Sequence, residues 1–122
     1  MCYQPSGNIA VTDEFVPRFI DFAVGFENIF GIDDTKSKSI LDEATSFLNI
    51  KRSTEKDSVQ IRNIKGLIRR CEAKATCKYV GLKNDQIHFM NLPFYETGTI
   101  EKNPMGVEDI EITIELLRKL KP

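Results

Sequence analysis

The chain has 122 residues, of which 41% are hydrophobic and 29% charged, and its formal net charge is -1. This size and balance predict one soluble globular domain at most and exclude a disordered chain. A charge so close to zero gives no reason to expect nucleic acid or an anionic membrane as a partner, and no apolar run approaches the roughly 20 residues that a membrane span needs.

The N-terminal segment and the cysteines predict a cytoplasmic protein. Residues 1–5 have neither the basic start nor the apolar core of a secretory signal. The three cysteines, Cys2, Cys71 and Cys77, form no CxxC pair. Cys71 and Cys77 would lie about 9 Å apart along one predicted helix, beyond the roughly 7 Å Cα separation that a disulfide can bridge. Reduced thiols are therefore expected, as in the cytoplasm.

Two helices are predicted in the first half of the chain. Residues 9–11 form an apolar stub, expected to be a short strand, and the first helix follows over residues 15–29, closed by Gly31. The second helix is predicted over residues 35–49. Apolar residues at helical spacing form the expected inner face of the first helix: Phe15, Phe19, Ile20, Phe22, Ala23 and Phe26.

The third predicted helix is the longest. A polar connector over residues 51–56 precedes it, and Asp57 with Gln60 three residues later resembles a capping box. Gly81 is the expected C-terminal cap. The apolar residues that recur along this helix form its expected buried stripe: Ile61, Ile64, Ile68, Cys71, Ala75 and Tyr79.

The last third of the chain predicts one strand and one helix. Residues 86–91 are moderately apolar and end at a Leu-Pro pair, which is typical of a short strand. Residues 108–120 predict a helix, although the alternation of Ile110, Ile112 and Ile114 with polar residues also fits a strand. The apolar residues able to share one face of this helix are Ile110, Ile114, Leu117 and Leu120. The order of elements indicates an α/β pattern that is rich in helices and has few strands for its sheet.

Few residues predict chemistry, and each has a plain structural alternative. His88 is the only histidine, so a three-ligand zinc site or a catalytic triad is not expected, and we interpret His88 as structural. Arg69 and Glu72 are three residues apart on one helix, where they form either a sugar-binding rim or a surface ion pair. Asn91 ends the predicted strand, where it either contacts a ligand or caps the strand. No catalytic residue or metal ligand is predicted.

Three segments together resemble the LmbE/PIG-L family of zinc-dependent sugar N-deacetylases. Residues 3–8, Tyr-Gln-Pro-Ser-Gly-Asn, resemble the end of the family's second strand and the turn after it. The helix carrying Arg69-x-x-Glu72-x-x-Ala75 and closing with Tyr-Val-Gly resembles the family's Arg-Glu-Ala helix. Residues 88–93, His-Phe-Met-Asn-Leu-Pro, resemble its "FLDLP" strand, with Asn91 where Asp is usual.

The sequence of residues 91–98 resembles that of one subgroup of the family, in which the deacetylase-like domain is fused behind a glucosamine-6-phosphate isomerase (deaminase) domain. The resemblance implies that residues 1–122 are one partial Rossmann-like domain, without its first strand and its C-terminal part. It implies zinc in the parent protein but none in this fragment, because the family's His-Pro-Asp-Asp segment is not in the chain. Arg69, Glu72 and Asn91 would then contact an amino-sugar substrate.

Two functions follow as expectations. The first is a fragment of an amino-sugar N-deacetylase-like domain from a deaminase fusion protein, inactive on its own and prone to form homo-oligomers through unpaired strand edges and uncovered apolar helix faces. The alternative is a small helical protein-interaction module without catalysis.

Overall fold

A computed structural model describes all 122 residues and contains four α-helices and two short strands. The helices are α1 (Phe15–Ile29), α2 (Thr35–Ile50), α3 (Val59–Tyr79) and α4 (Val107–Leu120), and the strands are β1 (Cys2–Tyr3) and β2 (His88–Phe89). Short 3-10 helices η1 (Asn8–Ala10), η2 (Asn84–Gln86) and η3 (Pro93–Tyr95) lie in the connections. The four predicted helices are confirmed, and none of them has the length and apolarity to cross a membrane.

The two strands lie side by side and run parallel, with Cys2 opposite His88 and Tyr3 opposite Phe89. The strand expected over residues 86–91 is shorter than predicted, since Asn91 has a φ of 49° and leaves the extended conformation. The strand expected over residues 9–11 is wrong, because the chain turns into η1 there and β1 lies earlier. The result is a helix-rich α/β arrangement, and its Rossmann-like origin stays a prediction.

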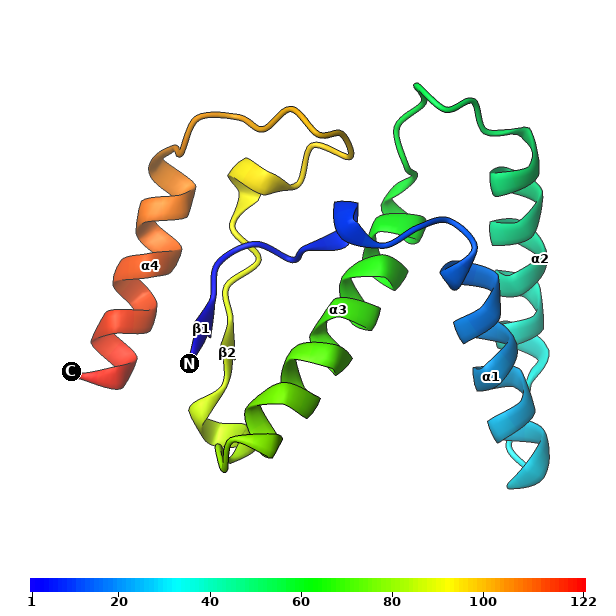
Figure 1. Ribbon diagram of the computed structural model, residues 1–122, viewed down its shortest axis with the longest axis horizontal. Helices are drawn as coiled ribbons and strands as arrows, with labels where there is room; N and C mark the ends of the chain where they lie inside the picture. Colours follow the sequence, from blue (N-terminus) through cyan, green and yellow to red (C-terminus); the bar gives the residue numbers. More distant parts are fainter.

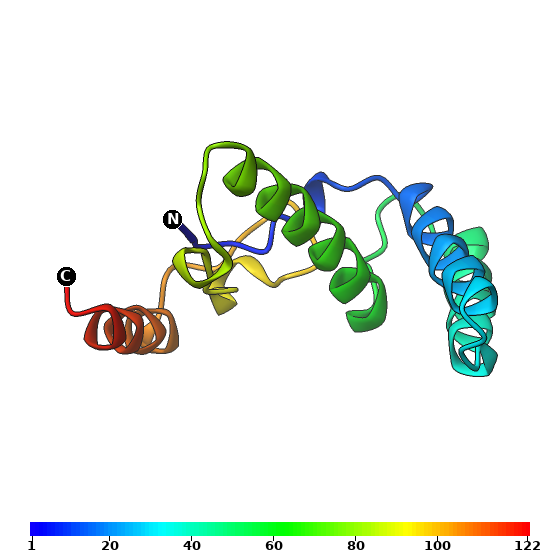
Figure 2. The ribbon, with the colours of Figure 1, turned by 90° about the horizontal axis from the view of Figure 1, so that it is seen from below.

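The elements form three parts in a row (Figures 1 and 2). The α1–α2 hairpin lies at one end, α3 and the strand pair form the middle, and α4 lies at the other end. The hairpin meets the first half of α3 in a small apolar core, which consists of Val16, Ile20, Ala44 and Ile61. This arrangement leaves much of each helix surface uncovered.

The inner face of α1 differs from the one predicted. Val16, Ile20 and Val24 are buried, at a spacing of four residues, whereas Phe22 is 72% exposed and the other phenylalanines of the helix are also exposed. Ile20 is the only residue that belongs both to the predicted inner face and to the buried residues of α1. Val16 packs against α2 and α3 in the core, whereas the phenylalanine rings stay exposed, and Phe19 lines an apolar groove with residues of α2 and α3.

The predicted stripes of α3 and α4 are correct only in part. Ile61 and Ile68 of α3 are buried and Ile64 is partly buried, but Cys71, Ala75 and Tyr79 are exposed, and Cys77 is buried in their place. The hairpin covers only the first half of α3, so the second half contacts the strand pair through a different face. On α4 all four residues of the predicted face are exposed: Ile110, Ile114, Leu117 and Leu120.

The start of α3 also differs from the prediction. Ser58, and not Asp57, is the N-cap, and its Oγ accepts a hydrogen bond from the Ile61 amide at 3.2 Å. Asp57 is instead buried and pairs with two lysines: its Oδ1 lies 2.6 Å from Lys51 Nζ and its Oδ2 lies 2.8 Å from Lys65 Nζ. The capping-box prediction for Asp57 and Gln60 is therefore wrong.

Asp13 completes this cluster, which we call the buried ion network and which consists of Asp13, Lys51, Asp57 and Lys65. Asp13 lies 3.0 Å from Lys51 Nζ and 2.6 Å from Lys65 Nζ, so each lysine contacts both carboxylates. The four residues come from the turn before α1, the C-cap of α2, the entry to α3 and α3 itself. Two positive and two negative charges balance, and the network joins the hairpin to the middle of the molecule.

Candidate functional site

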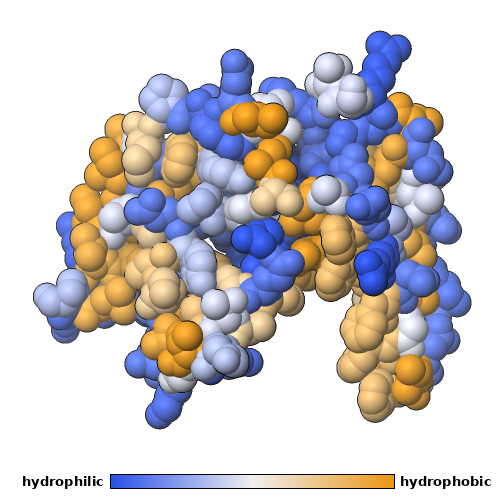
Figure 3. Space-filling view, in the orientation of Figure 1, coloured by the Kyte–Doolittle hydropathy of each residue, from blue (hydrophilic) through white to orange (hydrophobic).

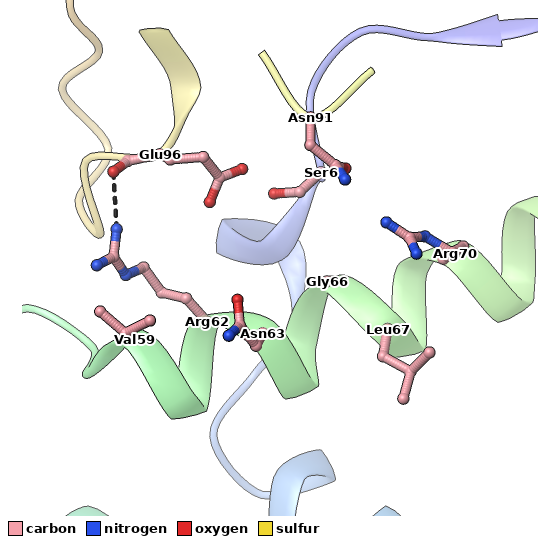
Figure 4. A pocket seen from close by; sticks show the side chains of 9 residues that line it. All are labelled: Ser6, Val59, Arg62, Asn63, Gly66, Leu67, Arg70, Asn91 and Glu96. Carbon is pink, nitrogen blue, oxygen red and sulfur yellow. Dashed lines mark hydrogen bonds between the residues drawn. The ribbon is translucent and has the colours of Figure 1, made fainter. Parts of the chain in front are cut away.

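A polar pocket lies along one face of α3, and we call it the α3 pocket. Its cavity volume is about 490 Å³, and only two of the nine residues that line it are hydrophobic. The lining residues are Ser6, Val59, Arg62, Asn63, Gly66, Leu67, Arg70, Asn91 and Glu96 (Figure 4). Helix α3 supplies six of them, and three loop segments supply Ser6, Asn91 and Glu96.

The helix period brings the polar α3 residues to this pocket. Arg62, Asn63, Gly66 and Arg70 are spaced so that they follow one side of the helix. Gly66 has no side chain, so the segment that carries Ser6 passes close to the helix: a Cβ at Gly66 would lie 3.7 Å from the Ser6 Cβ. The pocket floor is therefore backbone, and its rim is formed by guanidinium and amide groups.

Glu96 is fixed at one side of the pocket by two partners far away in the sequence. Its Oε2 accepts a hydrogen bond from Asn8 Nδ2 at 2.8 Å, and its backbone oxygen accepts one from Arg62 Nη1 at 2.7 Å. Its Oε1 is buried and accepts no hydrogen bond within the chain. Burial lowers the pKa of the neighbouring Lys102, and the negative charge of Glu96 opposes this change. Glu96 is thus a positioned acceptor with one free oxygen.

Arg70 lies at the other side of the pocket in Figure 4. Its guanidinium carbon is 5.1 Å from the ring centroid of Phe89, in a cation–π contact. The Phe89 ring in turn stacks on Tyr3, with 5.3 Å between the ring centroids. Arg70 is half-buried and forms no hydrogen bond or ion pair with the rest of the chain. Its donors are therefore available to a bound molecule.

Of the three residues predicted to contact sugar, only Asn91 lines the α3 pocket. Arg69 and Glu72 form an ion pair with each other, with 46% and 55% of their side chains exposed. Arg69 lies against the turn before η1, where a Cβ at Gly7 would be 3.3 Å from Arg69 Nε. This geometry agrees with the ion-pair alternative but leaves the sugar-contact prediction for all three residues untested.

Sequence reasoning did not identify Arg62, Asn63, Arg70 and Glu96. The three α3 residues have the helical spacing of a shared face, but a polar helix face is usually a solvated one. Glu96 lies in a segment predicted only as a loop, and its contact with Asn8 joins residues 88 positions apart. The helix spacing was the one signal that could have indicated this side of the pocket.

The residues of the chain do not fit a zinc ion. No three His, Cys, Asp or Glu side chains come together in an arrangement that can hold a metal. His88 lies in β2, and its backbone amide donates to the Met1 carbonyl oxygen at 2.9 Å. A catalytic zinc usually needs three protein ligands. The zinc that the resemblance implies therefore has no ligand set within residues 1–122, and the chemistry of this pocket is derived without it.

Comparison with known proteins finds one informative relative. No protein-family model matches the chain, and no solved structure matches it significantly. The whole chain aligns with a protein of Bacteroides thetaiotaomicron named "Putative glucosamine-6-phosphate deaminase-like protein", at 46% identity over 123 residues. The aligned segment is 19% of that protein. The chain is therefore similar, along its whole length, to about a fifth of a glucosamine-6-phosphate deaminase-like protein.

Proposed function

We propose that this chain belongs to an amino-sugar-processing protein and forms the sugar-binding wall of a deacetylase-like domain that accompanies a glucosamine-6-phosphate deaminase-like unit. The name of the relative, which is 46% identical over the whole chain, supports the connection to amino sugars. The motifs around Arg69 and Asn91 support the deacetylase-like part through their resemblance to the LmbE/PIG-L family. The α3 pocket is the place where we expect the sugar.

The observation that carries the proposal is the mixed polar lining of the α3 pocket, in which the Glu96 carboxylate and the Arg70 guanidinium lie on opposite sides (Figure 4). Glu96 Oε1 needs a donor, whereas the groups of Arg70 and Asn63 can donate to oxygen atoms. A sugar presents both kinds of group, because each hydroxyl donates one hydrogen bond and accepts others. An amino or acetamido nitrogen adds a further donor. A mixed polar lining of this kind suits a sugar better than an apolar ligand.

In this proposal residues 1–122 bind and orient the sugar and supply no catalytic group. The zinc that the family resemblance implies has no ligand set in residues 1–122, so no bond-breaking step is assigned to this chain. This chain would hold the sugar ring and thereby position its N-acetyl amide. Such positioning of the substrate supplies a large part of the rate acceleration of enzymes.

Calorimetric titration with N-acetylglucosamine tests this function. We expect saturable binding that Glu96→Gln weakens by roughly tenfold to a hundredfold, the loss typical of one hydrogen bond to a charged group. Glu111→Gln on the exposed surface of α4 removes the same charge far from the pocket and should leave the affinity unchanged. Absence of binding by the unmodified protein, or equal effects of both substitutions, would contradict the proposal.

The surface of the chain favours a second function, that of a protein-interaction module. The exposed area is 8730 Å², whereas a compact protein of 13.9 kDa exposes about 6,700 Å² by size scaling. The difference, about 2,000 Å², is more than twice the roughly 800 Å² that each partner buries in a standard protein interface. Hydrophobic residues gather over α1 and α4 in Figure 3. Phe22 of α1 and Ile110 of α4 are among the exposed large apolar side chains.

The two functions differ in which surface matters. A sugar-binding protein loses function when the α3 pocket is altered, whereas an interaction module loses it when the apolar face of α1 is altered. Two measurements separate the two functions: titration gives the sugar affinity of Phe22→Glu, and light scattering gives the molecular mass of Glu96→Gln. Unchanged sugar affinity in the first variant and unchanged molecular mass in the second would show that the two surfaces act independently.

A further inference from the structure

We propose that Arg70 binds an anionic substituent, a phosphate or carboxylate group, of the sugar in the α3 pocket. This inference rests on the proposed function, because it names the class of amino sugar that the same pocket takes. One juxtaposition carries it: a guanidinium without a partner in the chain is held on an aromatic ring at the edge of a polar pocket.

Arg70 differs from the two neighbouring arginines of α3 in forming neither a hydrogen bond nor an ion pair within the chain. Arg62 donates to the backbone oxygen of Glu96, and Arg69 pairs with Glu72, so each of them has a partner within the chain. The guanidinium carbon of Arg70 lies over the Phe89 ring, 5.1 Å from its centroid, and Arg70 forms no hydrogen bond within the chain. A full positive charge with five donors therefore faces the pocket without neutralisation.

The environment of Arg70 also holds it in place before a ligand binds. Phe89 lies in β2 and stacks on Tyr3 of β1, so the ring under the guanidinium belongs to the sheet. Because the contact with Phe89 restricts the guanidinium, binding costs less side-chain entropy than it would with a freely rotating arginine. A planar fork of donors matches the geometry of phosphate and carboxylate oxygens, with which arginine forms paired hydrogen bonds.

The charges of the pocket are separated in a way that suits such a ligand. Figure 4 shows the Glu96 carboxylate and the Arg70 guanidinium on opposite sides, with Ser6 and Asn91 between them. Hydroxyl or amino donors of a sugar would face Glu96, and an anionic group would face Arg70. The Asn91 amide and the Ser6 hydroxyl can donate to the same anionic group. A neutral sugar would leave the Arg70 charge without a partner.

Calorimetry with matched ligands tests the inference on the intact protein. The ligands are N-acetylglucosamine-6-phosphate, neutral N-acetylglucosamine and inorganic phosphate. The variants are Arg70→Gln, Arg70→Lys and the control Arg18→Gln, since Arg18 is exposed, forms no ion pair and also lies over an aromatic ring, 5.9 Å from the Phe15 centroid. Circular dichroism checks that each variant is folded.

We expect the phosphorylated sugar to bind more tightly than the neutral one. Arg70→Gln should weaken its binding by roughly tenfold to a hundredfold, the range of charge-assisted hydrogen bonds, and leave the neutral sugar unaffected. Arg70→Lys should restore part of the loss, because it keeps the charge but not the planar fork. Arg18→Gln should have no effect.

Two results would directly overturn the inference: equal affinity for both sugars in the unmodified protein, or a preference for the phosphorylated sugar that survives Arg70→Gln. A third would be an equal loss of affinity for both sugars in Arg70→Gln, which would mean that Arg70 only supports the fold. The failure of the proposed function looks different. If inorganic phosphate bound in an Arg70-dependent way while neither sugar bound, the anion site would stand and the sugar function would fall.

Discussion

Replacing Lys65 with Met should destabilise the protein strongly, because Lys65 is the most buried cation of the ion network. Its side chain is 5% exposed and contacts Asp57, also 5% exposed, and the half-exposed Asp13. Breaking a buried pair costs about 3–5 kcal/mol when one charge is left without a partner. Lys51 still contacts both carboxylates, so we expect a loss at the lower end of this range, about 3 kcal/mol.

Urea unfolding followed by circular dichroism measures this loss, which should lower the midpoint by more than about 1 M. Lys38→Met is the matched control, because Lys38 pairs with Asp34 on the exposed surface of α2, where salt bridges contribute little. Combining Lys65→Met with Asp57→Leu should recover part of the stability by removing the anion that lost its partner. A Lys65 variant no less stable than the Lys38 variant would refute this account of the network.

Three further predictions concern pH, a glycine and self-association. Burial raises the pKa of Asp13, but hydrogen bonds from Lys65 and Lys51 lower it more, so the net pKa is below its ordinary value. The stability that Asp13 contributes is therefore present above about pH 4, its ordinary pKa, and is lost as the pH falls through the lower pKa of the folded state. Asp13→Asn should flatten the acid limb of a curve of stability against pH. Gly7→Ala should reduce thermal stability more than Gly31→Ala, because both have positive φ, of 72° and 67°, but only the Gly7 methyl would meet another side chain. Light scattering should show self-association of the unmodified chain that Phe22→Glu weakens, and a monomer of about 14 kDa at high concentration would contradict it.

The helices could be predicted from the sequence, but not always the face that each one buries. In α1 two apolar stripes run side by side, one with Phe22 and one with Val16 and Val24. Both have helical spacing, so periodicity alone does not tell which stripe meets α2. Packing decides, and the smaller β-branched side chains allow the closer approach of the hairpin to α3.

The α3 pocket and the ion network could not be predicted because they depend on contacts between distant segments. The position of Lys65 in the sequence of α3 would equally fit a lysine on a solvent-exposed helix face. Only the contacts with Asp13 and Asp57 show that it is buried. Glu96 lies in a loop and is fixed by Asn8 from the N-terminal segment. Asn91 was predicted from its place at the end of an expected strand; it lies two residues beyond β2 and lines the pocket, and its contact with a sugar stays a prediction.

The most direct test of the account is to locate sugar binding on the chain by NMR. Titration of the isotope-labelled protein with N-acetylglucosamine should shift the backbone amide signals of Ser6, Gly66 and Asn91 with one common saturation curve, since these residues line the α3 pocket. Signals of the exposed α1 face around Phe22 should stay in place. Sugar-dependent shifts confined to α1, or no saturable shifts at all, would contradict a sugar site in the α3 pocket.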